Sequence, residues 1–401
     1  MIAAAVQHPA GAGRTTAQRL RLAGLRLAGR AYPRDRGRQR GSDTQPRSIL
    51  LIRPDHLGDL LFLTPALHAL RLALPSAHLT LLAGPWGAEA VRGNPDLDEL
   101  RLCRFPGFAR TTQKPGLAPY RLLASTAAEL SAERYDVALV LRFDHWWGAW
   151  LAAAAGIPRR LGYDLPETRP FLTEPISYGA GRHEVEQNLT LVRTLAPAAD
   201  RLAGPLRYIV RTEERDWASG WLSAQGIDLG RPLIAIHPGA GAAVKQWPAA
   251  AWAAVADDLS AAYSAQVVLT GGPAELSLTQ AVAAAMTRRA VDAAGQTSLG
   301  QLAALYARCR LALGADSGPL HLAVAAGAAT VHLYGPVPAA KFGPWGDPSR
   351  HRVVVSPWQC VPCDRLAWPA SQLAFHRCMA AISTAKVLAA AHQVLDLNYT
   401  D

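Results

Sequence analysis

The sequence lacks an apolar run of about 18 residues, the length at which a helix usually becomes able to span a membrane. Cysteine is scarce as well: five residues, an odd number in a chain of 401, argue against a secreted disulfide scaffold and favour a reducing cytoplasm. Half of the residues are hydrophobic and 18% are charged, as in globular proteins. The length is sufficient for two domains, each with its own core.

Acidic residues are almost absent from residues 1–47, which hold ten arginines and two aspartates. The rest of the chain is nearly neutral, which argues against a surface that binds nucleic acid. Leucines alternate with arginines between Arg19 and Arg30, so a helix there could contact an anionic membrane at the inner face of the plasma membrane. We expect a disordered basic extension instead, and a start codon placed too early is another alternative.

Apolar runs of strand length alternate with helix-like segments along the rest of the chain. This alternation predicts βαβ units, and therefore parallel sheets with helices on both faces. We expect an α/β protein with two Rossmann-like domains, residues 48–205 and 206–401, joined near Pro197–Gly204. The expected strands are 48–53, 78–83, 100–105, 137–141, 233–237, 266–270, 311–313, 330–334 and 352–355.

Ligands of open α/β sheets bind beyond the carboxyl ends of the strands, so these ends are the places to search. The strand at 48–53 leads into RPDHLGDLLFLTPAL (53–67), where Asp59 follows Gly58 at an expected helix start. A carboxylate at that position commonly caps the helix, and it could also act as a catalytic base. The stretch alone leaves both roles open.

Two glycines and a lysine follow the strand at 233–237, in HPGAGAAVKQWP (237–248). Gly239 and Gly241 let backbone amides approach an anion, and Lys245 adds a positive charge. The stretch is neither a Walker A loop nor a GxGxxG fingerprint, because it lacks a Gly-Lys-Ser/Thr triplet and has valine at position 244. An anion site and an ordinary turn with a surface lysine are equally open.

Two later strand ends carry acids close to an expected helix start. After TGGPAE (270–275), Glu275 could accept hydrogen bonds from ribose hydroxyls or cap the following helix. In GADSGPLHLA (314–323), Asp316 and Ser317 precede a helix that starts at Gly318, and His321 is either a ligand or a core histidine. The helix start favours a diphosphate and Asp316 favours a sugar hydroxyl, which together indicate a nucleotide-sugar.

In this order the segments resemble glycosyltransferase family 9, the ADP-heptose:lipopolysaccharide heptosyltransferases. The matching pieces lie within about residues 48–382: ILLIRPDHLGDLLFLTPAL, HEVEQNL, IHPGAGAAVKQWP, LTGGPAE and GADSGPLHLA. The resemblance implies a GT-B architecture, with two Rossmann-like domains facing each other across a cleft. It also implies an inverting, metal-independent transferase that needs no cofactor and moves a heptose from ADP-heptose to a lipopolysaccharide-core or other cell-envelope glycan.

The resemblance implies a role for each strand-end residue. Asp59 is the general base that takes the proton of the acceptor hydroxyl. Lys245 offsets the charge of the departing diphosphate, and Glu275 binds the ribose. The remaining donor-binding residues are Gly239, Asp316, Ser317, Gly318 and His321.

The acceptor side departs from the family pattern. Bulky aromatics in RFDHWWGAW (142–150) replace a segment that is commonly polar, and its tryptophans are either core residues or a platform for an acceptor sugar. We expect Arg53 and Arg142 to contact the acceptor, whose identity the sequence leaves open.

Cysteines raise a separate question. Cys360, Cys363, His376 and Cys378 have the types and the approximate spacing of a structural zinc set, although a single CxxC is weak evidence and free thiols are the default expectation. We predict no catalytic metal, because the resemblance implies a metal-independent transferase. Two other readings of the whole chain remain: an inactive protein that binds a nucleotide-sugar, and a dinucleotide-dependent oxidoreductase, for which no glycine fingerprint is present.

Overall fold

The structure, a computed structural model, describes residues 15–32, 45–108 and 116–397. The chain divides into two compact units. The first consists of residues 1–56, 65–180 and 185–204, and the second consists of 57–64, 181–184 and 205–401. The segments 57–64 and 181–184 thus belong by their packing to the second unit, although the chain around them belongs to the first.

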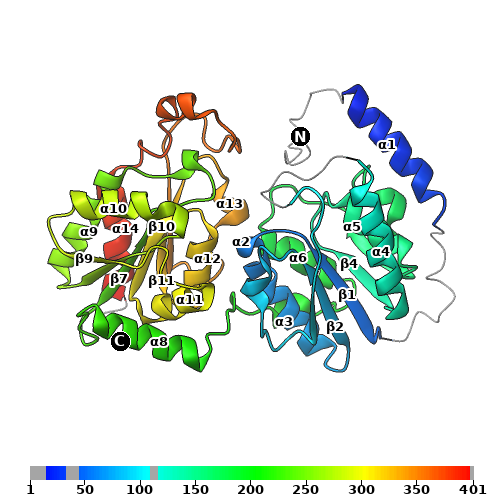
Figure 1. Ribbon diagram of the computed structural model, residues 1–401, viewed down its shortest axis with the longest axis horizontal. Coiled ribbons are helices and arrows are strands. Elements are labelled where there is room, and N and C mark those ends of the chain that lie inside the picture. The colour runs from blue at the N-terminus through cyan, green and yellow to red at the C-terminus, as the bar shows by residue number, and fades with distance from the viewer. Residues whose placement is uncertain (1–14, 33–44, 109–115, 398–401) are drawn as a thin grey trace. The chain divides into compact units, whose positions relative to one another are not determined.

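The first unit is built on a six-stranded parallel sheet of order β3-β2-β1-β4-β5-β6. Helices α4 and α5 cover one face through an apolar cluster, and α3 and α6 lie on the other side of the sheet (Figure 1). Its elements, with 3₁₀ helices labelled η, are α1 (Thr16–Gly29), β1 (Ser48–Arg53), α3 (Thr64–Ala73), β2 (His78–Ala83), η1 (Ala88–Val91), β3 (Glu99–Leu102), α4 (Ala118–Ala132), β4 (Val137–Val140), α5 (Trp146–Ala154), β5 (Arg159–Tyr163), η2 (Arg169–Phe171), β6 (Glu174–Ile176), α6 (Glu184–Val192) and α7 (Ala199–Leu202).

The second unit has a six-stranded parallel sheet of order β12-β11-β10-β7-β8-β9. Helices α9 and α14 pack on one face, and α11 and α12 lie on the other (Figure 1). Its elements are α2 (Leu57–Leu61), α8 (Thr212–Ala224), β7 (Leu233–His237), η3 (Ala243–Lys245), α9 (Ala249–Ala262), β8 (Gln266–Leu269), η4 (Pro273–Glu275), α10 (Leu276–Ala285), β9 (Ala290–Asp292), α11 (Leu299–Arg308), β10 (Leu311–Ala315), α12 (Gly318–Ala325), β11 (Ala329–Tyr334), α13 (Ala339–Phe342), β12 (His351–Val355), η5 (Ala370–Phe375) and α14 (Thr384–Leu397).

Most expected strands are confirmed, and three strands were missed. The runs at 48–53, 78–83 and 233–237 form strands with those bounds, because helices on both faces bury every inner position. Strands β6 and β9 have only three residues each, too few to show a pattern. Strand β5 begins with two arginines, and buried Arg160 is tolerated there because its guanidinium donates to the carbonyl oxygens of Phe171 and Ile157 at 2.7 and 2.6 Å.

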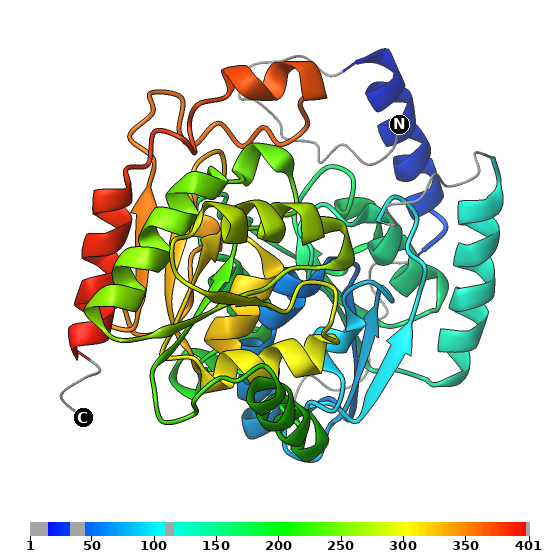
Figure 2. The same cartoon turned by 60° about the vertical axis from the view of Figure 1, so that its left-hand side comes forward.

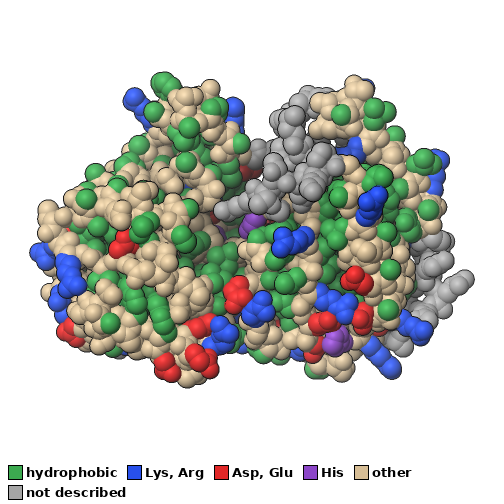
Figure 3. All heavy atoms as spheres, viewed as in Figure 1, with side chains coloured by type: hydrophobic (Ala, Val, Ile, Leu, Met, Phe, Trp, Pro, Cys, Tyr) green, Lys and Arg blue, Asp and Glu red, His purple; other side chains and the backbone are tan. Residues whose placement is uncertain are grey.

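The expectation of a disordered extension is wrong for residues 16–29, which form α1. Thr15 caps the helix, and Leu22 and Leu25 are buried against the first unit, so the apolar side of the segment has a surface on which to pack. Residues 1–14 and 33–44 lie outside the described part of the chain. On the surface shown in Figure 3, acidic and basic side chains are interspersed over both units. Among the described helices, each is too short or too polar to cross a bilayer.

Candidate functional site

The second unit brings Lys245 and Asp316 into direct contact at the carboxyl edge of its sheet. Strands β7 and β10 pair in parallel, with His237 opposite Gly314, so the segments that follow them emerge side by side. Lys245 Nζ donates to Asp316 Oδ2 at 2.8 Å, and His321 Nε2 lies 3.5 Å from Asp316 Oδ1. The structure therefore joins three of the predicted donor residues in one cluster.

Asp316 is held in its charged form although it is almost completely buried. Burial acts to raise its pKa, but the hydrogen bond with His321 and the charge of Lys245 outweigh burial and hold the pKa well below its usual value. Tyr334 adds a weak hydroxyl contact, with Oη 3.4 Å from Asp316 Oδ1. A permanently ionised carboxylate at this position can accept hydrogen bonds from neutral hydroxyl groups.

The start of α12 leaves polar groups available beside this carboxylate. Ser317 is the N-cap residue with extended backbone, but its side chain makes no capping hydrogen bond. Among the described residues, buried Ser317 Oγ and His321 Nδ1 have no hydrogen-bond partner. Pro319, in the first turn of α12, has no N–H, and the N–H groups of Leu320 and His321 donate to Ser317 O. The helix start therefore offers a phosphate the N–H of Gly318 and the Ser317 hydroxyl, next to an acceptor for a sugar hydroxyl.

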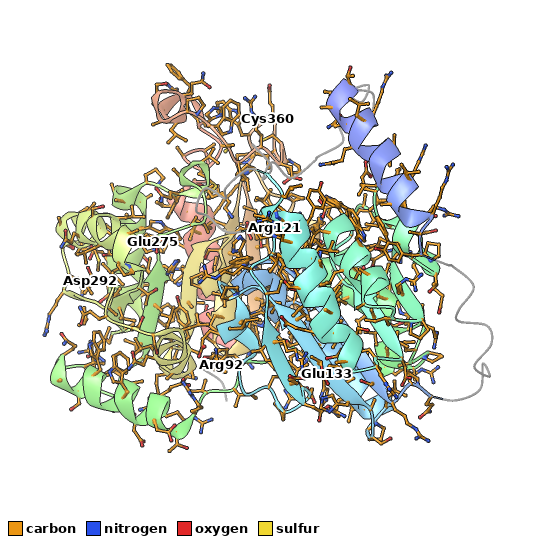
Figure 4. The ribbon with its side chains drawn as sticks, turned by 45° about the vertical axis from the view of Figure 1, so that its right-hand side comes forward. Arg92, Arg121, Glu133, Glu275, Asp292 and Cys360 are labelled. Atoms are coloured by element: carbon orange, nitrogen blue, oxygen red, sulfur yellow. The ribbon has the colours of Figure 1, made fainter. Side chains whose placement is uncertain are left out.

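Glu275 follows the neighbouring strand, β8, and is labelled in Figure 4. Its Oε2 accepts a hydrogen bond from the backbone N of Gly272 at 2.8 Å and lies 3.8 Å from His237 Nε2. This bond closes the single turn of η4, whereas Glu275 makes no side-chain capping bond as the N-cap residue of α10. Its Oε1 remains available to another donor. A Cβ atom on Gly239 would lie 2.0 Å from that oxygen, so a larger residue there would require the Glu275 carboxylate to move.

Asp59 lies in α2, which packs against α12 within the second unit. A Cβ atom on the preceding residue, Gly58, would lie 3.3 Å from His321 Cδ2, and the rings of Phe62 and His321 are 4.5 Å apart. Asp59 itself is half-buried in the first turn of the short helix rather than at its cap. The predicted base is thus carried by a helix that packs against the predicted sugar and diphosphate loop.

The carboxyl edge of the first sheet holds a different set of charges. Arg53, at the end of β1, pairs with Asp55 at 2.6 Å and donates to Asn188 Oδ1 at 3.0 Å. Arg142, after β4, also pairs with Asp55 and reaches Asp144 Oδ1 at 2.5 Å. Burial acts to raise the pKa of Asp55, but the two arginines outweigh it and lower the pKa to about 2.

The two predicted acceptor arginines differ in access. Only 2% of the Arg53 side chain is exposed, whereas 22% of the Arg142 side chain is exposed. The Arg142 guanidinium also lies over the ring of Phe108, at 5.1 Å. Arg142 can therefore contact a ligand, while Arg53 can only hold Asp55 in place.

The tryptophans of the aromatic segment pack inside the first unit. Trp147 belongs to its core and is 2% exposed, and Trp150 stacks on Phe171 at 5.3 Å. His145, in the same segment, is buried among aromatic rings, and neither ring nitrogen finds a hydrogen-bond partner in the described ranges. The structure thus favours the core interpretation for Trp147 and Trp150.

The residues that the sequence analysis missed are the partners of those it found. Asp55 pairs with both arginines, Asn188 accepts a hydrogen bond from Arg53, and Tyr334 supports Asp316. Asp55 lies two residues after the end of β1, so the strand-end rule could have found it. Asn188 lies in α6, and no local pattern connects it to a residue 135 positions earlier.

The cysteine set is not assembled as a metal site. Within residues 15–32, 45–108 and 116–397, no group of three or more His, Cys, Asp or Glu side chains is placed to hold a metal ion. Cys360 and Cys363 are exposed, Cys378 is buried, and His376 lies on the ring of Trp368 with centroids 3.5 Å apart. These residues belong to the stretch between β12 and α14, which projects from the second unit (Figure 2).

The fold and the site together define a class: a protein of two Rossmann-like units, the second of which carries a helix start, a lysine and acids at the carboxyl edge of its sheet. Comparison with known proteins makes the class specific. Residues 123–370 match glycosyltransferase family 9 (heptosyltransferase).

Similar proteins have names of the same kind. Lipopolysaccharide heptosyltransferase 3 of Escherichia coli is 25% identical over 298 residues, which cover 72% of this chain and 84% of that protein. A family 9 glycosyltransferase structure from Veillonella parvula is 26% identical with a TM-score of 0.74, covering 88% of this chain and 98% of that one. The structure of E. coli ADP-heptose lipopolysaccharide heptosyltransferase II shares the fold, with a TM-score of 0.68 at 23% identity and coverage of 88% and 99%.

The chain belongs to glycosyltransferase family 9. It is therefore a glycosyltransferase with the GT-B fold, of the heptosyltransferase type, and its relatives include lipopolysaccharide heptosyltransferases. The family resemblance and the fold class inferred from the sequence are confirmed. Because the chain belongs to this family, the alternative of a dinucleotide-dependent oxidoreductase is set aside.

Proposed function

We propose that this enzyme moves a heptose from ADP-heptose to a lipopolysaccharide-core or related cell-envelope glycan, with inversion at the anomeric carbon and without a metal ion. The names of its relatives support the heptose and the acceptor class, and one of them is named for ADP-heptose. We place the reaction in the cytoplasm, since the five cysteines are all free thiols.

The observation that carries the proposal is the buried contact between Lys245 and Asp316 at the start of α12. A diphosphate needs positive charge and N–H donors, which Lys245 and the helix start can supply. A sugar needs acceptors for its hydroxyl groups, which Asp316 can supply. We assign the ribose to Glu275, which follows β8, the strand next to β7.

The chemical step is a single displacement. Asp59 takes the proton from the acceptor hydroxyl while that oxygen attacks the anomeric carbon. The bond from this carbon to the diphosphate oxygen breaks on the opposite side, and ADP leaves with the electron pair. Lys245 and the N–H of Gly318 at the start of α12 offset the charge that develops on the departing oxygen, which is the work that a metal ion does in other transferases.

The acceptor side of the proposal rests on the first unit. Arg142 supplies a half-buried positive charge with aromatic side chains beside it, which suits a sugar that carries an acidic group. Arg53 acts indirectly, by holding Asp55 against Arg142. We therefore assign the acceptor contact to Arg142 and a positioning role to Arg53.

A donor panel tests the nucleotide and the sugar. Thermal unfolding is followed with ADP-heptose, ADP-glucose, UDP-glucose and GDP-mannose, because a ligand that binds the folded state raises its melting temperature. We expect the largest rise with ADP-heptose, and product analysis by NMR should show the anomeric configuration opposite to that of the donor. A larger rise with a UDP- or GDP-sugar, or a product with retained configuration, would contradict the proposal.

The base is tested separately by Asp59→Asn. We expect kcat to fall by about 10²- to 10⁴-fold, the usual contribution of a general base, while ADP affinity measured by calorimetry stays close to wild type. Asp216→Asn, an exposed aspartate on α8, is the matched control and should leave both quantities unchanged. Transfer by Asp59→Asn at close to the wild-type rate would remove Asp59 from the base role.

A further inference from the structure

Helix α1 carries two parallel stripes of unlike chemistry, one on the side opposite its buried residues and one along the flank between the two. Leu20 and Leu27 are seven residues apart, two helical turns, and lie on one line along the helix. Their side chains are 69% and 66% exposed. Over α1, at the upper right of Figure 3, hydrophobic and Lys/Arg side chains both reach the surface.

The second stripe is basic. Arg19, Arg26 and Arg30 follow one another at spacings of seven and four residues, so they line the same side of the helix, next to the leucines. All three are exposed, and residues 15–32 contain no aspartate or glutamate. The exposed side of α1 thus combines apolar and positively charged groups.

The opposite side of α1 is fixed to the first unit. Gly29 approaches Pro170 so closely that a Cβ atom on it would lie 2.6 Å from Pro170 Cβ. At the end of the helix, Trp150 Nε1 donates to Tyr32 Oη at 3.2 Å, and Arg21 lies over the ring of Trp146 at 6.0 Å. Because α1 is anchored in this way, its leucines and arginines are displayed by a rigid support.

A hollow of about 740 Å³ adjoins the basic stripe. It is lined by Arg26 and Arg30 from α1 and by Arg169 from η2, against one carboxylate, Asp164, which pairs with Arg169. Three guanidinium groups against one carboxylate leave the hollow positive, so it suits a phosphate group.

We propose that the outer side of α1 docks the enzyme on an anionic lipid bilayer. The leucines enter the boundary between headgroups and acyl chains, the arginines pair with lipid phosphates, and the hollow receives one headgroup. The proposal commits to lipid because exposed leucine and arginine in adjacent stripes match the two layers of a bilayer surface, apolar and anionic. It does not depend on which sugar or acceptor the enzyme uses.

Vesicle co-sedimentation of the full chain tests the proposal. Vesicles of phosphatidylethanolamine and phosphatidylglycerol in equal amounts are compared with vesicles of phosphatidylcholine alone. We expect binding to the anionic vesicles only, and weaker binding as salt is raised, because exposed charges are screened. Binding of equal strength to both kinds of vesicle, or to neither, would overturn the proposal.

Substitutions on the outer side localise the binding to α1. Arg26→Gln should weaken binding to the anionic vesicles about fivefold, and the pair Leu20→Ser and Leu27→Ser should weaken it by about tenfold or more. The matched controls are Arg92→Gln and Leu72→Ser, which change exposed residues of the first unit outside α1. Figure 4 shows Arg92 far from that helix. Both control variants should bind the vesicles as wild type does. Wild-type binding by the α1 variants would overturn the assignment.

Two further readouts separate this proposal from its rivals. Transfer to a soluble acceptor should be unchanged in the α1 variants. A wild-type enzyme without transfer activity would therefore contradict the proposed function, whereas a failed vesicle assay would contradict the lipid proposal. Analytical ultracentrifugation without lipid should show the same sedimentation for wild type and for Leu20→Ser with Leu27→Ser. A dimer that these substitutions dissociate would mean that α1 docks a second copy of the chain, and the lipid proposal would be wrong.

Discussion

The two units have the same strand order, but the charged side chains at the carboxyl edges of their sheets are arranged differently. When the strands of each unit are numbered from 1 in chain order, both sheets have the order 3-2-1-4-5-6. Strand β1 therefore corresponds to β7, and β4 corresponds to β10. Around β1 and β4, two arginines and two aspartates pair among themselves. Around β7 and β10, Lys245 and Asp316 pair beside a helix start whose capping side chain makes no capping bond.

The difference lies in what is left for a ligand. In the first unit, Asp55 is enclosed by Arg53 and Arg142, so its charge serves the structure of that edge. In the second unit, the N–H of Gly318 and the hydroxyl of Ser317 are added to the ion pair, and neither has a partner among the described side chains. One topology therefore supports two kinds of edge, and the residues after the strands determine which one forms.

The largest expected effect is on stability, at the edge of the first unit. Asp55→Asn leaves buried Arg53 without its charge partner, so we expect the free energy of unfolding to fall by about 3–5 kcal/mol. The measurement is urea unfolding followed by circular dichroism. Asp144→Asn is the control, because Asp144 is 28% exposed and its ion pair is with Arg142, which keeps Asp55 as a partner; the expected loss is about 1 kcal/mol or less. Equal losses in the two variants would contradict the enclosed role of Asp55.

The next effect is on ligand binding, at the edge of the second unit. Lys245→Met removes a charge that we assign to the diphosphate, so ADP affinity measured by calorimetry should fall by about 10- to 100-fold, the range for a charge-assisted hydrogen bond. Lys386→Met, exposed on α14, and Arg142→Met, at the edge of the first unit, should leave ADP affinity unchanged. If Arg142→Met weakened ADP binding as much as Lys245→Met, the contrast between the two edges would fail.

Sequence reasoning reached much of the fold and only part of the site, for physical reasons. Long apolar strands such as β1 and β7 are visible because both of their faces are buried, whereas the three residues of β9 carry no pattern. The strand-end rule found Lys245 and Asp316, because each follows its strand directly or within one loop. The rule could not predict that Lys245 and Asp316 are in contact, because this depends on the pairing of β7 with β10. Nor could it predict the hydrogen bond from Arg53 to Asn188.

Helix α1 shows the limit of composition as a guide. The many arginines before residue 47 indicated disorder, but the leucines between them have a surface on which to pack. Leu22 and Leu25 are buried while Leu20 and Leu27 are exposed, a division that follows from helical geometry once the packed side is known. Composition does not reveal which side that is.

A smaller effect tests the packing behind Glu275. Gly239→Ala would place a methyl group against Glu275 Oε1, so the acid must move; we expect ADP affinity to fall by about tenfold, the value of one to two lost hydrogen bonds. Pyrophosphate affinity should change less, because Glu275 is assigned to the ribose. Gly241→Ala is the control, since a Cβ atom there meets nothing within 4 Å. An equal loss for ADP and pyrophosphate would place Glu275 away from the ribose.

The smallest effect concerns acid sensitivity in the first unit. Burial lowers the pKa of His145 to about 3 from its ordinary value of 6.5, with the carboxylates of Asp55 and Asp144 opposing burial and the charges of Arg142 and Arg53 adding to it. The unfolded imidazole takes up a proton below about pH 6.5 and the folded one only near pH 3. His145 therefore makes the protein less stable as the pH falls through this range, by about 1 kcal/mol between pH 6.5 and 5.5.

His145→Phe isolates this contribution, because phenylalanine fits among the surrounding aromatic rings and does not titrate. Urea unfolding at pH 6.5 and 5.5 should show a smaller loss of stability in the variant than in wild type. Buried His237 and His332 in the second unit also have lowered pKa values, chiefly because of burial, and keep their share of the acid sensitivity in both proteins. If wild type and variant lost the same free energy of unfolding between pH 6.5 and 5.5, folded His145 would have to take up a proton near neutral pH. The edge of the first unit would then be more open to water than its enclosed charges indicate.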